Sequence, residues 1–400
     1  MSVLPGSLKA ILLAMLGGSP PPALSEGEWA TVGAMARQHR LEPMLAWRDG
    51  PNTGPRWAVP EAVAARWREA LDHSARQSLA QQAALRLLSA SLTARGIAFV
   101  VLKGARLAWS VYPAPALRPM RDLDVLVAPQ DLLPAAQALA QAGFSSPLAE
   151  SALLARAMAE DKHLPPLWHE TLGVAVELHH RLTDLPARRA YHVPQLDPAA
   201  MLAGAEAVEL GGVAMPCPRP NDLLAHLMVH ALYGHRLDCG PLVLADIHFL
   251  LDRETIDWRS FWEAARQDRW SRGAALLLAL VERRFSTHGA VLPPDVVQPP
   301  IEMIEAAEEA MLQDLDERGH GEAMADLFAA RSPAALGGAI RRRLTPDKQV
   351  TASEGEGMPA WRFWPVWAWR RISRLADRAR DPRVAAEARQ AAALLRWLQS

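Results

Sequence analysis

The chain has 400 residues, of which 50% are hydrophobic and 22% are charged, so it is long enough for two or three subdomains and too apolar for a disordered protein. Its formal net charge of -1 excludes a global electrostatic field that attracts nucleic acid or an anionic membrane. Its only cysteines, Cys217 and Cys239, exclude a disulfide framework and a Cys-rich zinc site, and they favour a cytoplasmic protein. No apolar window is long enough for a transmembrane helix.

Residues 1–95 are predicted to form an N-terminal helical region. A short helix is expected at Ser7–Leu16, where a pair of glycines ends it, and Ser25 followed by Glu28 is a capping-box pattern that begins a second helix. From Glu61 to Arg95 the chain contains no glycine or proline, which predicts one long helix.

The stretch from Ile97 to Val127 combines strand patterns with charge. Ile97–Leu102 is a continuous run of strand-forming residues, which predicts a strand buried on both faces. A short helix is expected to open at Gly104, and the three prolines of Tyr112–Arg121 predict a non-helical loop. Asp122–Val127 then alternates polar and apolar residues at its start and predicts a second strand.

Residues 96–216 are predicted to form an α/β core around these two strands. A helix is expected at 129–142. The segment 162–182 contains two extended stretches around a Glu-Thr-Leu-Gly turn, which predict an antiparallel pair. A smaller hairpin is expected at 207–215.

Residues 217–330 are predicted to form a helical domain that binds substrate or a partner. The expected helices are Asn221–Tyr233, Leu242–Leu251, Trp258–Gln267, Gly273–Phe285 and Ile301–Asp316. In the first of them, His226 and His230 lie four residues apart on one face, which is a spacing of metal ligands. The residues between them lack the glutamate of the HExxH motif of metalloproteases, so packed histidines are favoured over a zinc site.

Residues 331–400 are predicted to form a Trp/Arg-rich tail and a last helix, Pro382–Leu398. The segment Trp361–Arg371 interleaves tryptophan with arginine, a composition that suits contact with a protein, a membrane surface or an RNA backbone. The alternative, which we favour, is that its aromatic side chains pack on the helical domain while the arginines stay in water.

Two carboxylates on the second strand indicate a metal site. Asp122 and Asp124 are two residues apart, so their side chains leave the same face of the strand. Burial of two like charges is costly unless a cation neutralises them, and Mg²⁺ prefers oxygen ligands of this kind. The alternative is that the strand enters solvent at this end, with Arg118 and Arg121 as surface partners of the aspartates.

A phosphate site is predicted at the turn between the first strand and the short helix. Gly104 permits close approach of the backbone, the free amides of the helix start favour anions, and Lys103 supplies a positive charge. Arg118 and Arg121, in the loop before the aspartates, either bind the triphosphate or pair with those aspartates.

A third carboxylate, Glu177, lies in an otherwise apolar strand that reads VAVELHH. If this strand neighbours the aspartate strand, the three carboxylates complete a site for two metal ions. Because side chains alternate along a strand, His179 shares the face of Glu177 and His180 does not.

Together these motifs resemble the nucleotidyltransferase superfamily that includes DNA polymerase beta, and in particular an uncharacterised bacterial branch of it. The matching motifs are LKG at 102–104, Tyr-Pro at 112–113, Arg118, DxDxLV at 122–127 and ELH at 177–179. The resemblance covers residues 99–182 and extends more loosely to about Asp246. Lys103 departs from the wider superfamily, which has a small residue at this position.

The residue patterns and the resemblance together give a set of predicted functional residues. The catalytic metal ligands, for Mg²⁺ or Mn²⁺, are Asp122, Asp124 and Glu177; the phosphate-binding residues are Lys103, Gly104, Arg118 and Arg121; the substrate-pocket residues are His179, His230 and Asp246. The last two fall where the branch carries a histidine and an aspartate on helices.

We therefore predict an α+β protein in which a small mixed sheet is flanked by N-terminal helices and a C-terminal helical domain. The predicted activity is transfer of a nucleoside monophosphate from an NTP such as ATP to a hydroxyl or similar acceptor of a small molecule, peptide or protein. The near-neutral charge argues against a long nucleic acid as the acceptor. The alternative function is a non-catalytic nucleotidyltransferase-like module that binds or regulates a partner.

Overall fold

The computed structural model describes residues 7–50, 53–54, 56–145, 158–185, 191–285, 292–314, 328, 365–369, 373 and 382–400. The chain divides into two compact units, Met1–Pro186 with Val193–Pro299 and Ala187–His192 with Pro300–Ser400. The finer division of the sequence at residues 95, 216 and 330 stays a prediction.

The first unit begins with helices α1 (Leu8–Leu16), α2 (Glu26–Gln38), α3 (Glu42–Arg48) and α4 (Glu61–Ala94). The predicted capping box begins α2: Ser25 Oγ accepts a hydrogen bond from the Glu28 amide, and the Glu28 carboxylate accepts one from the Ser25 amide. Helix α4 runs unbroken for 34 residues, as predicted. The sequence pattern did not predict the short α3. Its first turn contains Pro43, and proline is tolerated there because the N–H groups of a first turn have no hydrogen-bond partner within the helix.

A five-stranded mixed sheet forms the centre of this unit, in the order β1-β2-β5-β4-β3. Its strands are β1 (Phe99–Val101), β2 (Asp122–Val127), β3 (Phe144–Ser145), β4 (Leu167–His169) and β5 (Val174–His179). β2 and β5 are parallel, with Asp124 directly opposite Glu177, and the other pairings are antiparallel, including the predicted pair of β4 and β5. The α+β fold is therefore as predicted, and the aspartate and glutamate strands are neighbours.

Short helices lie between strands of the sheet: α5 (Lys103–Ser110) between β1 and β2, and α6 (Leu132–Gln141) between β2 and β3. The sheet is followed in the chain by α8 (Pro198–Ala203) and by a separate hairpin of β6 (Glu206–Leu210) and β7 (Val213–Cys217). The proline-rich loop before β2 differs from the prediction by one turn of 3₁₀-helix at Pro115–Leu117, where the proline at the first position fits this geometry.

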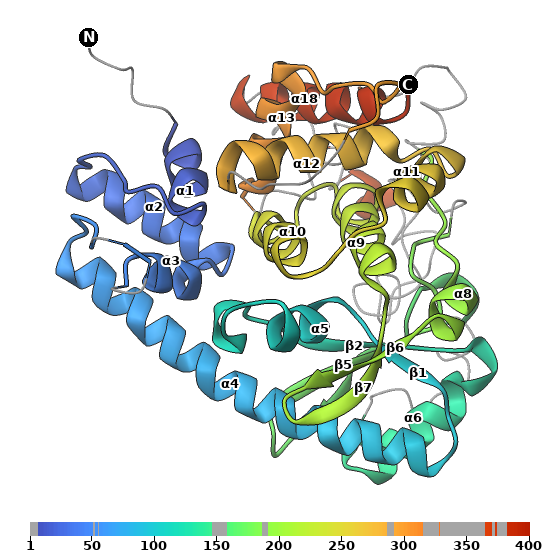
Figure 1. The fold of residues 1–400 in the computed structure, drawn as a ribbon. Coiled ribbons are helices and arrows are strands. Elements are labelled where there is room, and N and C mark those ends of the chain that lie inside the picture. Colours follow the sequence, from blue (N-terminus) through green and yellow to red (C-terminus); the bar gives the residue numbers. More distant parts are fainter. Residues whose placement is uncertain are drawn as a thin grey trace. The chain divides into compact units, whose positions relative to one another are not determined.

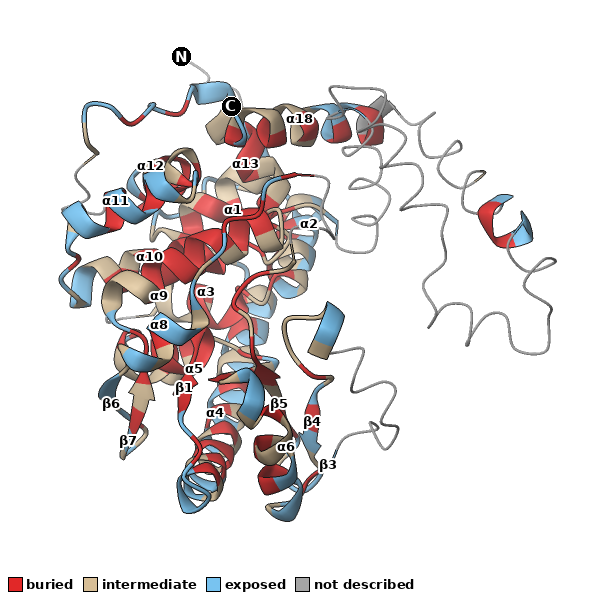
Figure 2. Ribbon diagram, turned by 90° about the vertical axis from the view of Figure 1, so that its right-hand side faces the viewer, coloured by how far each residue is buried: buried red, intermediate tan, exposed pale blue. Residues whose placement is uncertain are grey.

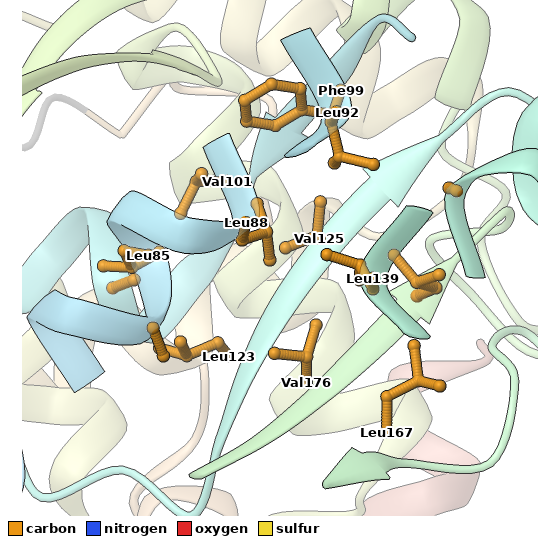
Figure 3. Packing of buried hydrophobic residues seen from close by; sticks show 14 of the residues in the cluster. Leu85, Leu88, Leu92, Phe99, Val101, Leu123, Val125, Leu139, Leu167 and Val176 are labelled. Atoms are coloured by element: carbon orange, nitrogen blue, oxygen red, sulfur yellow. The ribbon is translucent and has the colours of Figure 1, made fainter. Parts of the chain in front are cut away.

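One face of the sheet carries the main hydrophobic core, on which α4 and α6 lie (Figure 3). Leu123 and Val125 of β2 and Val176 of β5 point to this side and pack with Leu88 of α4 and Leu139 of α6. All five side chains are fully buried, and burial of each contributes about 1.5–3 kcal/mol relative to exposure. The carboxylates of β2 and β5 therefore leave from the opposite face.

The opposite side of the sheet faces the helices that follow the β6–β7 hairpin (Figure 1). They are α9 (Pro220–Val229), a turn of π-helix (His230–Gly234), α10 (Leu242–Arg253), α11 (Trp258–Gln267) and α12 (Ser271–Phe285). Helix α10 is buried along most of its length (Figure 2). The predicted helix at 221–233 is observed as α9, except that its last turn is π-helical.

The second unit contains α13 (Ile301–Met311) and α18 (Pro382–Leu398), which contact each other. The Trp361–Arg371 segment lies outside the described residues apart from the helical stretch 365–369, so its predicted contacts stay predictions. Within the described part of the chain, the helices are all too short or too polar to cross a membrane.

Candidate active site

Three potential metal ligands converge where β2 and β5 run side by side. One donor atom each from Asp124, Glu177 and His179 lies within 4.8 Å of the other two, a group of three found among the described residues. The register explains this convergence, because Asp124 is opposite Glu177 and His179 follows on the same face two residues later. The imidazole nitrogen joins the two predicted carboxylates as a third donor.

His179 lies between the two carboxylates. Its Nε2 is 2.7 Å from Asp124 Oδ1 and 3.6 Å from Glu177 Oε2, and its side chain is 1% exposed. Burial acts to raise the pKa of Asp124, but the charges of Lys103 and His179 outweigh it and hold that pKa well below its usual value. Burial likewise acts to raise the pKa of Glu177, but the hydrogen bond from His179 opposes it, and the pKa is lowered.

A second imidazole, His163, lies on the other side of Glu177. Its Nε2 is 3.5 Å from Glu177 Oε2, and its ring centroid is 4.8 Å from that of His179. The sequence offered no signal for His163, because it stands before β4 in a segment without a motif. Burial and the positive charge of Lys103 lower the pKa of Lys162, the neighbour of His163 in the chain, and the charges of Asp124 and Glu177 oppose this effect.

Lys103 supplies the cation that pairs with Asp124 in this structure. Its Nζ is 3.4 Å from Asp124 Oδ2, and the residue is only 7% exposed. Lys103 begins α5 with a φ of 31°, a left-handed conformation that is costly for a residue with a Cβ atom. Backbone strain at the predicted phosphate turn thus accompanies a buried ion pair with the predicted metal ligand.

Asp122 lies on the same face of β2 as Asp124 but is not a member of the three-donor group. Burial raises its pKa to about 6, and the neighbouring charges of Asp124 and Glu177 act in the same direction. The two aspartates therefore differ: Asp124 is compensated by Lys103 and His179, whereas Asp122 is less well compensated.

The predicted residues Arg118 and Asp246 contact each other. Arg118 donates from Nε and Nη2 to the two carboxylate oxygens of Asp246, both at 2.8 Å, and the Tyr112 hydroxyl donates to Asp246 Oδ1 at 2.6 Å. Burial would lower the pKa of Arg118, but Asp246 raises it above its ordinary value. This bidentate pair joins the loop before β2 to α10.

Gly104 leaves the space that Arg118 occupies. A Cβ atom on Gly104 would lie 2.7 Å from Arg118 Nη1 and 2.8 Å from Met120 Sδ, distances that side chains do not adopt. The predicted close approach at this glycine is thus made by the protein's own arginine loop.

Two further arginines lie near Asp122. Burial, together with the like charges of Arg121 and Arg118, lowers the pKa of Arg40 to about 10. Arg40 has a φ of 57°, and its buried Nε has no hydrogen-bond partner among the described residues. The sequence analysis did not predict a role for Arg40, because it follows α2 and lies far from the motifs in the chain. Arg121, by contrast, was predicted; it lies in the loop before β2 and is exposed.

Histidines of α9 complete the buried side of the site. His226 is 0% exposed, and neither of its ring nitrogens has a hydrogen-bond partner in the part of the chain that the structure describes. Burial holds its pKa well below the ordinary value, with Lys103 and His179 acting in the same direction. His230, predicted as a pocket residue, lies 5.9 Å from the His226 ring and 4.3 Å from the ring of His235.

The donor set fits a divalent cation. Two carboxylates and an imidazole are ligand types that divalent metal ions accept in enzymes, and all three are held on hydrogen-bonded strands. The same site contains lysine and arginine side chains that suit an anionic substrate.

A family model described as "Uncharacterised nucleotidyltransferase" matches residues 25–286. No curated protein and no solved structure matches the chain. The matched range contains the whole sheet, α4 and the helices from α9 to α12, and hence every residue of the site described above. The match also covers well over half of the 400 residues. The chain therefore belongs to this family of uncharacterised nucleotidyltransferases.

Proposed function

We propose that the protein transfers a nucleoside monophosphate from an NTP to a hydroxyl group of a small molecule, peptide or protein, with Mg²⁺ or Mn²⁺ as cofactor. The observation that carries this proposal is the convergence of Asp124, Glu177 and His179 beside Lys103, in a member of a nucleotidyltransferase family. Asp124 and Glu177, with Asp122 or His179, would hold the cation. When bound, such a cation stabilises the charge of the leaving phosphates and favours deprotonation of the attacking hydroxyl.

The reaction is an in-line displacement at the α-phosphorus. The acceptor oxygen forms a bond to this phosphorus, the bond from the phosphorus to the bridging oxygen of the β-phosphate breaks, and pyrophosphate leaves with the electron pair. The hydroxyl proton is released to water. Because the protein forms no covalent intermediate in this scheme, its residues act by positioning the two substrates and by compensating charge.

The positive side chains supply the phosphate site. Lys103 and the amides at the start of α5 lie beside Asp124, and Arg40 and Arg121 lie near Asp122. A triphosphate bound there relieves the repulsion between the two arginines, since its charge is of the opposite sign. Arg118 is bound to Asp246, so we propose that it positions the loop before β2; its predicted contact with phosphate stays a prediction.

Nucleotide binding by the full-length protein tests the proposal. We expect isothermal titration with each of the four NTPs in the presence of Mg²⁺ to show binding of at least one, and Asp124→Asn to remove that binding. Asp252→Asn is the matched control, because Asp252 is exposed on α10 and lies outside the site. Circular dichroism shows that each variant is folded. If no NTP binds in a manner that depends on Asp124, the proposed function is wrong.

A further inference from the structure

An imidazole in the ligand group distinguishes this site from a site built of carboxylates alone. Asp122, Asp124 and Glu177 would offer only oxygen, which is what Mg²⁺ requires. The donor atoms that converge are instead those of Asp124, Glu177 and His179. The choice of cation therefore depends on whether the His179 nitrogen binds the metal or only hydrogen-bonds the carboxylates.

The position of His179 is that of a ligand. It is on β5, which pairs with β2, so the backbone fixes its distance from both carboxylates. Its Nε2 lies 2.7 Å from Asp124 and 3.6 Å from Glu177, which places this nitrogen between the two oxygens. The side chain is 1% exposed and has little freedom to turn away.

The other ring nitrogen permits the required tautomer. Nδ1 of His179 is buried and has no hydrogen-bond partner among the described residues. Neither the backbone nor another side chain in that part of the protein requires Nδ1 to be an acceptor. Without a cation, Nε2 is the donor of the hydrogen bond to Asp124. No contact of Nδ1 prevents the imidazole from carrying its proton there when a cation takes the place of the proton on Nε2.

We propose that His179 is a metal ligand together with Asp124 and Glu177, and that the site consequently binds Mn²⁺ in preference to Mg²⁺. The inference deepens the proposed function, on which it rests only for the role of the cation in catalysis. Mn²⁺ accepts carboxylate and water ligands as Mg²⁺ does, but it also accepts imidazole, whereas Mg²⁺ strongly prefers oxygen. The oxygen-rich remainder of the site argues against a cation that requires several nitrogen or sulfur ligands.

The test uses Mn²⁺ alone, without nucleotide, and the full-length protein. Electron paramagnetic resonance of a Mn²⁺ titration gives its affinity, and calorimetry gives that of Mg²⁺. Pulsed electron paramagnetic resonance reports a directly bound ¹⁴N atom. The variant His179→Gln replaces the imidazole by an amide with an oxygen donor. The matched control is His73→Gln, since the imidazole of His73 is exposed on α4 and lies outside the ligand group. His163→Gln tests the neighbouring imidazole, which contacts Glu177, as the alternative nitrogen ligand.

We expect the wild type to bind Mn²⁺ about 10-fold or more tightly than Mg²⁺ and to show ¹⁴N coupling. His179→Gln should lose the coupling and weaken Mn²⁺ binding about 10–100-fold, with little change for Mg²⁺. His73→Gln should retain both the coupling and the affinity, and His163→Gln should retain the coupling. Absence of ¹⁴N coupling in the wild type, or coupling that disappears in His163→Gln but not in His179→Gln, overturns the inference. The wild-type spectrum decides the matter even if His179→Gln does not fold.

Failure of this inference is distinct from failure of the proposed function. A site that binds Mg²⁺ and Mn²⁺ equally through oxygen atoms would contradict the role of His179, yet NTP binding that depends on Asp124 would still support nucleotidyl transfer. Conversely, selective Mn²⁺ binding through His179 without any NTP binding would leave a metal site and remove the proposed reaction.

Discussion

At the scale of single residues, Asp122 and Asp124 show how neighbours decide the state of a buried carboxylate. Both leave the same face of β2, and burial acts to raise the pKa of each. Lys103 and His179 reverse this effect at Asp124, which is in direct contact with both. Asp122 is less well compensated, so burial, together with the negative charges of Asp124 and Glu177, raises its pKa to about 6.

We expect Asp122→Asn to stabilise the cation-free protein more at pH 8 than at pH 5. A raised pKa favours folding while Asp122 is protonated, so this contribution is complete below the ordinary pKa of 3.8 and is lost as the pH rises through about 6. At pH 8 the wild type carries the unfavourable charge and the amide does not, which predicts a gain of about 1–3 kcal/mol for the variant.

Urea unfolding at the two pH values, without divalent cations, measures this difference. Asp252→Asn on the exposed face of α10 should change the free energy of unfolding little at either pH. An equal effect of Asp122→Asn at pH 5 and pH 8 would contradict the assigned cause of the shift.

At the scale of elements, α4 is the support of the sheet face opposite the site. Its buried residues Leu85, Leu88 and Leu92 recur at helical spacing and pack on β1 and β2 (Figure 3). The side-chain amide of Gln81, also on α4, donates a hydrogen bond of 3.0 Å to the carbonyl of Met120, two residues before β2. The helix therefore fixes both the plane of the sheet and the start of the aspartate strand.

Adjacent leucines of α4 give a matched test of this role. Leu88 is 0% exposed, whereas its neighbour Leu87 is 40% exposed. We expect Leu88→Ala to lower the free energy of unfolding by about 2–5 kcal/mol, because it leaves a cavity in the core. Leu87→Ala should cost less than about 1 kcal/mol. Chemical denaturation of the two variants measures both values, and similar costs would show that α4 does not support the sheet through this face.

Elements whose pattern is local could be predicted from the sequence. The alternation of β2 and the absence of glycine and proline from α4 indicated their bounds within one or two residues. The pairing of β2 with β5 could not be derived in this way, because the two strands are separated by some fifty residues and their parallel contact is a tertiary event. Only the motif resemblance suggested it.

The residues of the candidate site can likewise be divided into those that a local sequence pattern indicates and those that only the fold reveals. Asp122, Asp124, Glu177 and Lys103 stand out as charges inside apolar runs, so their interest is visible in the sequence. His226 belongs to a helix whose pattern is that of an ordinary buried helix, and only the fold shows that Lys103 and His179 act on it. Arg40 and His163 likewise lie in loops without a signal.

At the scale of the whole molecule, the first unit combines a sheet and a helical region that a buried polar cluster joins. Arg118 comes from the loop before β2, Tyr112 from the end of α5, and Asp246 from α10, more than one hundred residues later. Tyr112 also packs on Phe249 of α10, with ring centroids 4.7 Å apart. Asp246 thus links the loop before β2 to the helical region through two side chains, and the buried pair of Arg106 with Glu254 is a second polar link.

We expect Asp246→Ala to lower the free energy of unfolding by about 3–5 kcal/mol, because it leaves the buried guanidinium of Arg118 without its partner. Asp252→Ala, on the same helix but with a side chain 66% exposed, should cost less than about 1 kcal/mol. Thermal and urea unfolding of both variants measure the difference. Equal stability of the two would show that the Arg118–Asp246 pair does not join the sheet to the helices.

The ion pair of Lys103 has a consequence for how the site responds to its surroundings. The ammonium group is attached to the chain, so its local concentration beside Asp124 is constant, whereas the concentration of a free cation varies. Any cation that binds Asp124 must displace the ammonium group of Lys103, and the free energy of this displacement lowers the observed affinity for the cation. A cation that binds at Asp124 would therefore show a lower apparent affinity than the same carboxylates would give it without Lys103.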